Sequence, residues 1–70
     1  MKKLNEKGNF VRTYKDRKLV YENYHRTAET AYEEYLDIIA RVKKYGFDGN
    51  EFDVARFNDG YIMTIETFKK

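Results

Sequence analysis

Few side chains in this sequence could do acid–base or metal chemistry, and their spacing favours neither. His25 is the only histidine and cysteine is absent, so a His-rich or thiolate metal site cannot be assembled. Glu33 and Asp37 have the i,i+4 spacing of paired carboxylates, but on the polar side of the expected helix Asp37 is placed to pair with Arg41. A lone histidine at a strand end is usually a surface or packing residue. We therefore expect no enzyme activity, no catalytic residue, no metal and no cofactor.

Ion-binding and phosphate-binding loops are not indicated either. Residues 48–51 (Asp-Gly-Asn-Glu) look like a fragment of a calcium-binding loop, but they lack the regular spacing of acidic residues that such a loop needs. They fit better as the turn that leads out of a helix. The chain has no glycine-rich segment of the kind that cradles phosphate groups. No small-molecule substrate is indicated.

The feature that points to binding is the aromatic content. Seven tyrosines and five phenylalanines make up 17% of the 70 residues, and tryptophan and proline are absent. A domain of this length buries only roughly 60% of the surface of its unfolded chain, so its core needs few rings. Rings left outside the core are candidate anchors for a partner, because they bring a large apolar area with a defined contact geometry.

Composition and charge limit the class of protein further. The net charge is only +2, which is too weak to indicate a polyanionic partner by itself. The absence of cysteine excludes a disulfide framework and favours a reducing, cytoplasmic compartment. Lys2 and Lys3 are not followed by an apolar stretch, and no run of about 18 apolar residues occurs, so we expect neither a signal peptide nor contact with a membrane. We expect one soluble domain over residues 1–70.

The elements that would position these side chains begin with an amphipathic helix over residues 28–45. Its larger apolar residues recur with the helical period: Ala28, Ala31, Tyr32, Tyr35, Leu36, Ile39 and Val42. Thr27 or Thr30 can cap the start of this helix. Gly46 follows its end, where a residue in the left-handed conformation is common.

A hairpin is expected after the helix, over residues 51–58 and 61–68, because Asp59-Gly60 is a strong signal for a two-residue type I′ turn. A regular register from this turn pairs Asn58–Tyr61, Phe57–Ile62, Arg56–Met63, Val54–Ile65 and Phe52–Thr67. The face expected to meet the helix carries Phe52, Val54, Tyr61, Met63 and Ile65. The opposite face carries Asp53, Ala55, Phe57, Ile62, Thr64 and Glu66.

A hairpin is also expected before the helix, over residues 9–14 and 19–25, around a polar turn with no glycine or asparagine to fix its type. In a regular register one face carries Phe10, Arg12, Tyr14, Leu19, Tyr21 and Asn23. The other face carries Val11, Thr13, Val20, Glu22 and Tyr24. We place the first face inward because its rings remove more apolar area from water, at roughly 25 cal/mol per Å². Both faces are half apolar, so the reverse orientation stays open.

The order of elements is therefore ββαββ, an α+β domain in which two antiparallel hairpins form a sheet with one helix packed on one face. One helix can cover only one face of a sheet, so the other face must meet water, a second copy or another protein. We expect this free face to be the contact surface of a non-enzymatic module that binds another protein or forms a homodimer. The expected contact residues are Val11, Val20, Tyr24, Phe57 and Ile62.

Single-stranded nucleic-acid binding is the alternative function. The basic first hairpin combines Arg12 with the rings of Tyr14 and Tyr21, as proteins that stack nucleic-acid bases do. A free face with these three residues would offer a stacking platform, whereas a free face with Glu22 would place an acid where phosphates must lie. The RNP1 signature of RNA-recognition domains is absent. We therefore favour protein binding.

A short ββαββ chain that is charged, rich in tyrosine, free of cysteine and proline and begins with Met-Lys-Lys resembles the small proteins encoded by bacteriophages and other mobile elements. Some of these, such as the anti-CRISPR proteins, inhibit host defences. The resemblance is one of style over the whole chain and includes no diagnostic motif, so no functional residue is carried over. It implies stoichiometric inhibition by binding a host protein or a protein–nucleic-acid complex.

Overall fold

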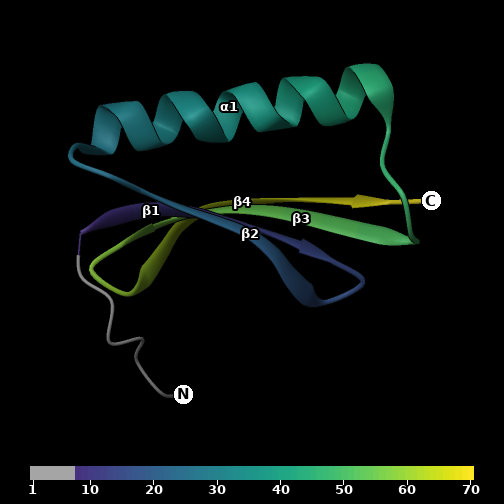
Figure 1. Cartoon of the computed structure of the whole chain (residues 1–70), viewed down its shortest axis with the longest axis horizontal. Coiled ribbons are helices and arrows are strands. Elements are labelled where there is room, and N and C mark those ends of the chain that lie inside the picture. Colours follow the sequence, from purple (N-terminus) through teal and green to yellow (C-terminus); the bar gives the residue numbers. More distant parts are fainter. Residues whose placement is uncertain (1–7) are drawn as a thin grey trace.

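The computed structural model describes residues 8–70 and places one helix across one face of a four-stranded antiparallel sheet (Figure 1). The elements are β1 (Asn9–Lys15), β2 (Lys18–His25), α1 (Ala28–Tyr45), β3 (Glu51–Asn58) and β4 (Tyr61–Lys69). The strand order is β2-β1-β3-β4, so β1 and β3 pair at the centre and β2 and β4 form the edges. The expected ββαββ fold is confirmed. Lys2 and Lys3, on which the signal-peptide expectation depends, lie outside the described residues.

The helix α1 forms because both ends are capped and one stripe is apolar. Thr27 caps the start, since its Oγ1 accepts a hydrogen bond from the backbone N–H of Thr30 at 3.1 Å. Gly46 follows the last turn with a φ of 81°, and its N–H donates to the carbonyl of Val42 at 2.8 Å. The helix residues buried against the sheet are Ala31, Tyr35 and Ile39. The expected helix and its caps are therefore confirmed, whereas Tyr32 and Leu36 of the expected apolar stripe are exposed.

The core beneath α1 uses the face of β1 that we expected to point outward. Val11 of β1 and Val54 of β3 are fully buried against the helix, and Phe52 and Phe68 pack at the margin of this core. Side chains alternate along a strand, so Phe10 lies on the other face of the sheet. The prediction that Phe10 points inward and Val11 outward is therefore wrong. Its physical argument fails because the apolar area of Phe10 is buried in a second cluster on the outer face.

A β-bulge interrupts the pairing of β1 with β2. Tyr14 lies opposite Leu19, as expected, but Thr13 lies opposite Tyr21, so Val20 is an extra residue with no partner in β1. The extra residue reverses which side chains of β2 share a face with those of β1. Tyr14 shares the outer face with Phe10, and Leu19 lies opposite Tyr14, before the bulge. Tyr21, beyond the bulge, points toward the helix. Of these three, all placed inward by the regular register, only Tyr21 is where it was predicted.

An equivalent bulge interrupts the pairing of β3 with β4. The two pairs next to the turn are those expected, but Arg56 lies opposite Thr64 rather than Met63, which leaves Met63 as the extra residue. The remaining predicted pairs are wrong, and the observed ones include Val54–Glu66 and Phe52–Phe68. As a result Phe68 joins the core beneath α1, whereas Ile65 turns to the outer face.

Candidate protein-interaction surface

The face of the sheet away from α1 has a small core of its own. The rings of Phe10 and Phe57 stack with centroids 4.7 Å apart and 4° between their planes, and the ring of Tyr24 stacks on Phe10 at 5.0 Å. The strand register explains this row of rings, because Phe10 lies opposite Tyr24 on one side and Phe57 on the other. Phe10 and Ala55 have no exposed surface, and Phe57 retains only 4%. Two of the three rings are therefore closed to any partner.

Arg12 lies over this row of rings. Its guanidinium carbon is 4.9 Å from the ring centroid of Phe10 and 5.4 Å from that of Phe57, which is the range of cation–π contacts. Its Nε donates a hydrogen bond to the carboxylate of Glu22 on β2, so the two side chains also form an ion pair. A cation held by two rings and a carboxylate completes the small core, and its charge is already balanced on this face.

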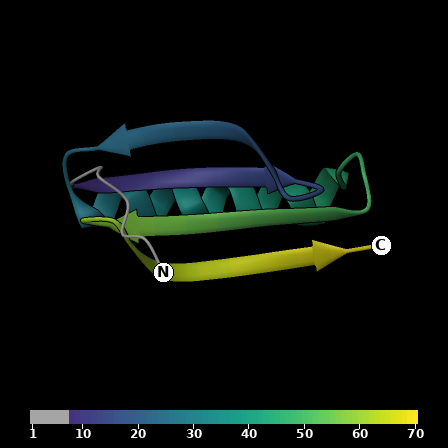
Figure 2. The ribbon, with the colours of Figure 1, turned by 90° about the horizontal axis from the view of Figure 1, so that it is seen from below.

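Exposed apolar side chains flank the small core on both sides. They are Leu19 and Tyr24 of β2 and Ile62 and Ile65 of β4, which are 49–52% exposed. Each lies opposite an outer-facing residue of β1 or β3, which fixes its side of the sheet. Seen from this side, β2 and β4 flank the central strands and α1 lies behind them (Figure 2). We call these four residues the outer patch.

The five predicted contact residues have different positions in the structure. Tyr24 and Ile62 belong to the outer patch, and Val20 is exposed at the first bulge. Val11 is not on this face at all, because it is fully buried beneath α1. Phe57 is on the outer face but covered within the ring stack, so it is not an exposed anchor. The exposed apolar surface is thus displaced from the centre of the sheet to its edge strands.

Sequence reasoning missed Leu19 and Ile65, which it placed beneath the helix. The error at Ile65 follows from the bulge at Met63, because the extra residue moves Ile65 from opposite Val54 to opposite Ala55. The error at Leu19 follows from the orientation of β1, because Leu19 lies opposite Tyr14 as expected and Tyr14 is on the outer face. Neither bulge residue is a glycine or has a positive φ, the features that mark one common type of bulge. The residue types therefore give no local signal for these bulges.

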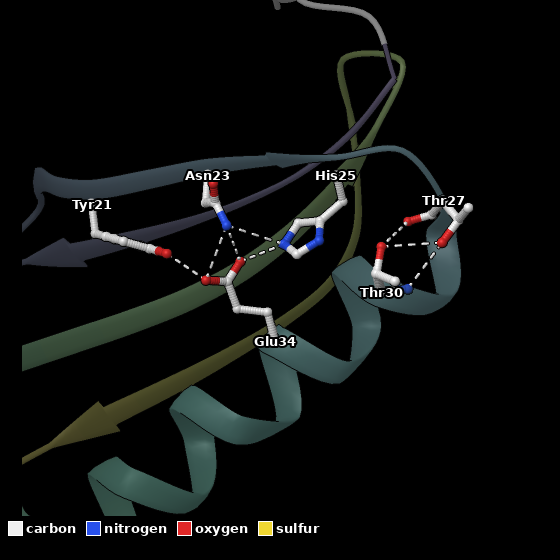
Figure 3. A network of polar contacts seen from close by, with 6 residues as sticks. All are labelled: Tyr21, Asn23, His25, Thr27, Thr30 and Glu34. Carbon is white, nitrogen blue, oxygen red and sulfur yellow. Dashed lines mark hydrogen bonds and ion pairs between the residues drawn. The ribbon is translucent and has the colours of Figure 1, made fainter.

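A group of polar side chains lies on the helix side of β2. Tyr21, Asn23 and His25 alternate along the strand, and all three turn toward Glu34 of α1 (Figure 3). His25 Nε2 is 2.6 Å from Oε1 of the Glu34 carboxylate. Asn23 Nδ2 donates to both oxygens of that carboxylate at 3.2 and 3.3 Å, and the Tyr21 hydroxyl donates to Oε2. The four residues form one network that ties the edge strand β2 to the helix.

The network changes the proton affinity of two of its members. Burial by itself raises the pKa of Glu34, but the hydrogen bonds from His25, Tyr21 and Asn23 outweigh burial, so the pKa lies below its usual 4.5. The hydrogen bond to Glu34 raises the pKa of Tyr21 above its usual 10.0, and burial adds to the effect. Both shifts favour a carboxylate that accepts and a phenol that donates.

Comparison with known proteins adds no identification. No family model matches this sequence, and no curated protein and no solved structure is significantly similar to it. Within residues 8–70, no helix is long and apolar enough to cross a membrane. The same part of the chain contains no group of three or more acidic and histidine side chains arranged to hold a metal ion. Any statement about function therefore depends on the geometry of this chain.

Proposed function

We propose that this protein is a non-enzymatic binding module that recognises another protein through the outer patch. The observation that carries the proposal is that exposed apolar side chains surround a buried cluster on one face of the sheet. Leu19, Tyr24, Ile62 and Ile65 are half exposed on a face that no other element covers among residues 8–70. The rings of Phe10 and Phe57 between them are buried and stacked on each other. Apolar side chains held beside such a cluster lose little conformational entropy when they bind, which is the usual property of interface anchors.

The charges on this face favour a protein over a nucleic acid. Arg12 is already paired with Glu22, and Asp53 shares the outer face of β3 with Ala55 and Phe57. A nucleic-acid strand crossing the patch would bring phosphates close to these two acids. The stacking platform of the alternative function is also incomplete, because Tyr21 points to the helix and donates its hydroxyl proton to Glu34.

The resemblance to small phage proteins suggests the kind of partner. A host protein or a protein–nucleic-acid complex, bound stoichiometrically, would make this chain an inhibitor of the anti-CRISPR kind. A second copy of the chain is the other candidate, since pairing two outer faces across a twofold axis would cover both patches. Both partners use the same four side chains, so one set of variants addresses both.

The test compares substitutions of equal chemistry on the two sides of the molecule. Ile62→Asp places a charge in the outer patch, whereas Leu36→Asp places the same charge on α1, where the leucine is 45% exposed. Light scattering measures self-association of each variant. Quantitative pull-down from the native host, with mass spectrometry, measures capture of other proteins. We expect Ile62→Asp and Tyr24→Asp to lose the partner, or the dimer, and Leu36→Asp to retain it.

Two results would contradict the proposal. In the first, the unmodified protein is monomeric, and it captures the same proteins as Ile62→Asp and Leu36→Asp do. The other is tight binding to single-stranded DNA or RNA at low salt that weakens steeply as salt is added, which would favour the alternative function. Chain-wide loss of folding is recognised by circular dichroism, and Ile65→Ser then replaces Ile62→Asp as the milder variant.

A further inference from the structure

Arg56 of β3 and Thr64 of β4 are cross-strand neighbours on the helix-facing side of the sheet. Arg56 Nε and Thr64 Oγ1 are both buried, and neither has a hydrogen-bond partner among residues 8–70. Buried polar atoms in folded proteins are nearly always partnered, by protein, water or a ligand. Two such atoms on cross-strand neighbours therefore mark a place where water or a ligand can supply the missing partner.

The charge at this place is also unbalanced. Two other arginines form ion pairs, Arg12 with Glu22 and Arg41 with Asp37. Within the described part of the chain Arg56 has no ion pair. Its guanidinium carbon lies 5.3 Å from the ring centroid of Tyr32 on α1, so the charged group lies beside an aromatic ring.

The two sides of the helix differ in this respect. On the β2 side, α1 contributes the carboxylate of Glu34, which accepts hydrogen bonds from Tyr21 and Asn23. On the β4 side, α1 contributes the ring of Tyr32 beside Arg56, and no carboxylate is bonded there. The arrangement thus supplies a cation, a hydroxyl and an aromatic face. Glu66 lies on the same face of β4, two residues from Thr64, but forms no ion pair with Arg56.

We propose that Arg56 and Thr64 bind a small oxyanion, a carboxylate or a phosphate group, between β4 and the first turns of α1. The Nε–H of Arg56 and the hydroxyl of Thr64 donate to its oxygens. Cross-strand neighbours hold their side chains close enough for one oxyanion to reach both. The Tyr32 ring lies beside the guanidinium, whose planar fork is the geometry with which arginine recognises carboxylate and phosphate. An anion, unlike a water molecule, also balances the guanidinium charge. This site is separate from the outer patch and does not depend on its function.

The direct test uses the unmodified protein and nuclear magnetic resonance. Sodium acetate and sodium phosphate are titrated in turn, with sodium chloride at equal ionic strength as the reference. We expect the Nε–Hε signal of Arg56 and the amide signal of Thr64 to shift and saturate with acetate or phosphate. The Nε–Hε signal of Arg41, which pairs with Asp37 on the exposed side of α1, should not saturate. The anion with the higher affinity decides between the two chemistries.

Substitutions give the second arm. Arg56→Gln and Arg41→Gln each remove one positive charge, at two different places. A general electrostatic effect would therefore lower the affinity of both variants for the anion to the same extent. We expect Arg56→Gln to lose about tenfold or more in affinity, the value of a hydrogen bond to a charged group, and Arg41→Gln to keep it. Thr64→Val should show an intermediate loss. The proposal would be overturned if the signals of both arginines shifted linearly without saturation, or if chloride caused the same shifts as acetate and phosphate. Water would then be the partner of Arg56 and Thr64. If Arg56→Gln does not fold, the titration of the unmodified protein decides alone.

Discussion

Asp16 and Asp59 hold the same position in the two hairpins and bind the opposite hairpin in the same way. The N–H of Asp16 donates to the carbonyl of Glu51 at 2.9 Å, and its Oδ1 accepts from the N–H of Glu51 at 3.0 Å. Asp59 makes the same two bonds with Gly8, both at 2.8 Å. Each turn is therefore fastened to the beginning of the other hairpin's central strand. The sheet is thus built from two similar hairpins related by an approximate twofold axis.

The first prediction concerns this fastening. The N–H groups of Asn50 and Glu51 donate to the Asp16 carboxylate and hold its pKa below the usual 3.8. Asp16→Ala should lower the melting temperature, because it removes both bonds and places alanine at a φ of 51°. Asp16→Asn should lower it less, since asparagine keeps an acceptor and tolerates this φ. Asp48→Ala, an exposed aspartate nearby, is the control. Equal melting temperatures for Asp16→Ala and Asp48→Ala would refute the role of the turn.

The second prediction concerns acid stability. The folded-state pKa of Glu34 is below its ordinary 4.5, so its stabilising contribution is complete above about that pH and is lost as the pH falls through the folded value. Glu34→Gln should therefore lower the free energy of unfolding at pH 7 by about 1 kcal/mol and flatten its fall in acid. Urea denaturation between pH 7 and pH 3 measures both. Glu33→Gln, its exposed neighbour on α1, should leave the profile unchanged. Parallel acid profiles for Glu34→Gln and the unmodified protein would speak against the network.

The third prediction concerns alkaline stability. The pKa of Tyr21 is raised above 10.0, so its contribution is complete below that value and disappears as the pH rises through the folded pKa. Tyr21→Phe should lower the free energy of unfolding at pH 7 by about 1 kcal/mol and remove this alkaline loss. The Tyr21→Phe, Glu34→Gln double variant should lose less free energy of unfolding than the two single variants added together, because both substitutions affect the same hydrogen bond. Strict additivity would show that the bond contributes nothing.

The elements of this fold could be predicted from sequence because their signals are local. The apolar stripe with Thr27 and Gly46 at its ends determines α1, and Asp59-Gly60 determines the turn of the second hairpin. The turn of the first hairpin also has two residues, Asp16 and Arg17, both with positive φ. Its type could not be predicted, because neither residue is a glycine. Local signals of this kind do not depend on what packs against the element.

The faces of the strands could not be predicted, because those of β2 and β4 depend on two extra residues and the orientation of β1 depends on which of two half-apolar faces packs beneath α1. Val20 and Met63 follow the turn aspartates at the same distance, and the sequences before them, from Val11 and from Val54, align without a gap. This internal similarity is the one signal in the chain for a shared bulge. A register drawn without the two bulges places the side chains of β2 beyond Val20, and those of β4 beyond Met63, on the wrong face of the sheet. Nor does the sequence show that the ring of Phe10 is buried on the face away from the helix.

The last prediction separates the small outer core from the patch around it. Phe10 has no exposed surface and stacks on both Tyr24 and Phe57, so Phe10→Ala leaves a cavity between the two remaining rings. It should cost about 3 kcal/mol or more in free energy of unfolding, as in an ordinary core. Tyr24→Ala removes only the outer ring of the row and should cost about 1 kcal/mol. If the face away from α1 were merely an open surface, both substitutions would cost little, and thermal and urea unfolding of the two variants would coincide. A large cost for Phe10→Ala with a small one for Tyr24→Ala means that this sheet is stabilised on both faces, and that Tyr24 remains available for a partner.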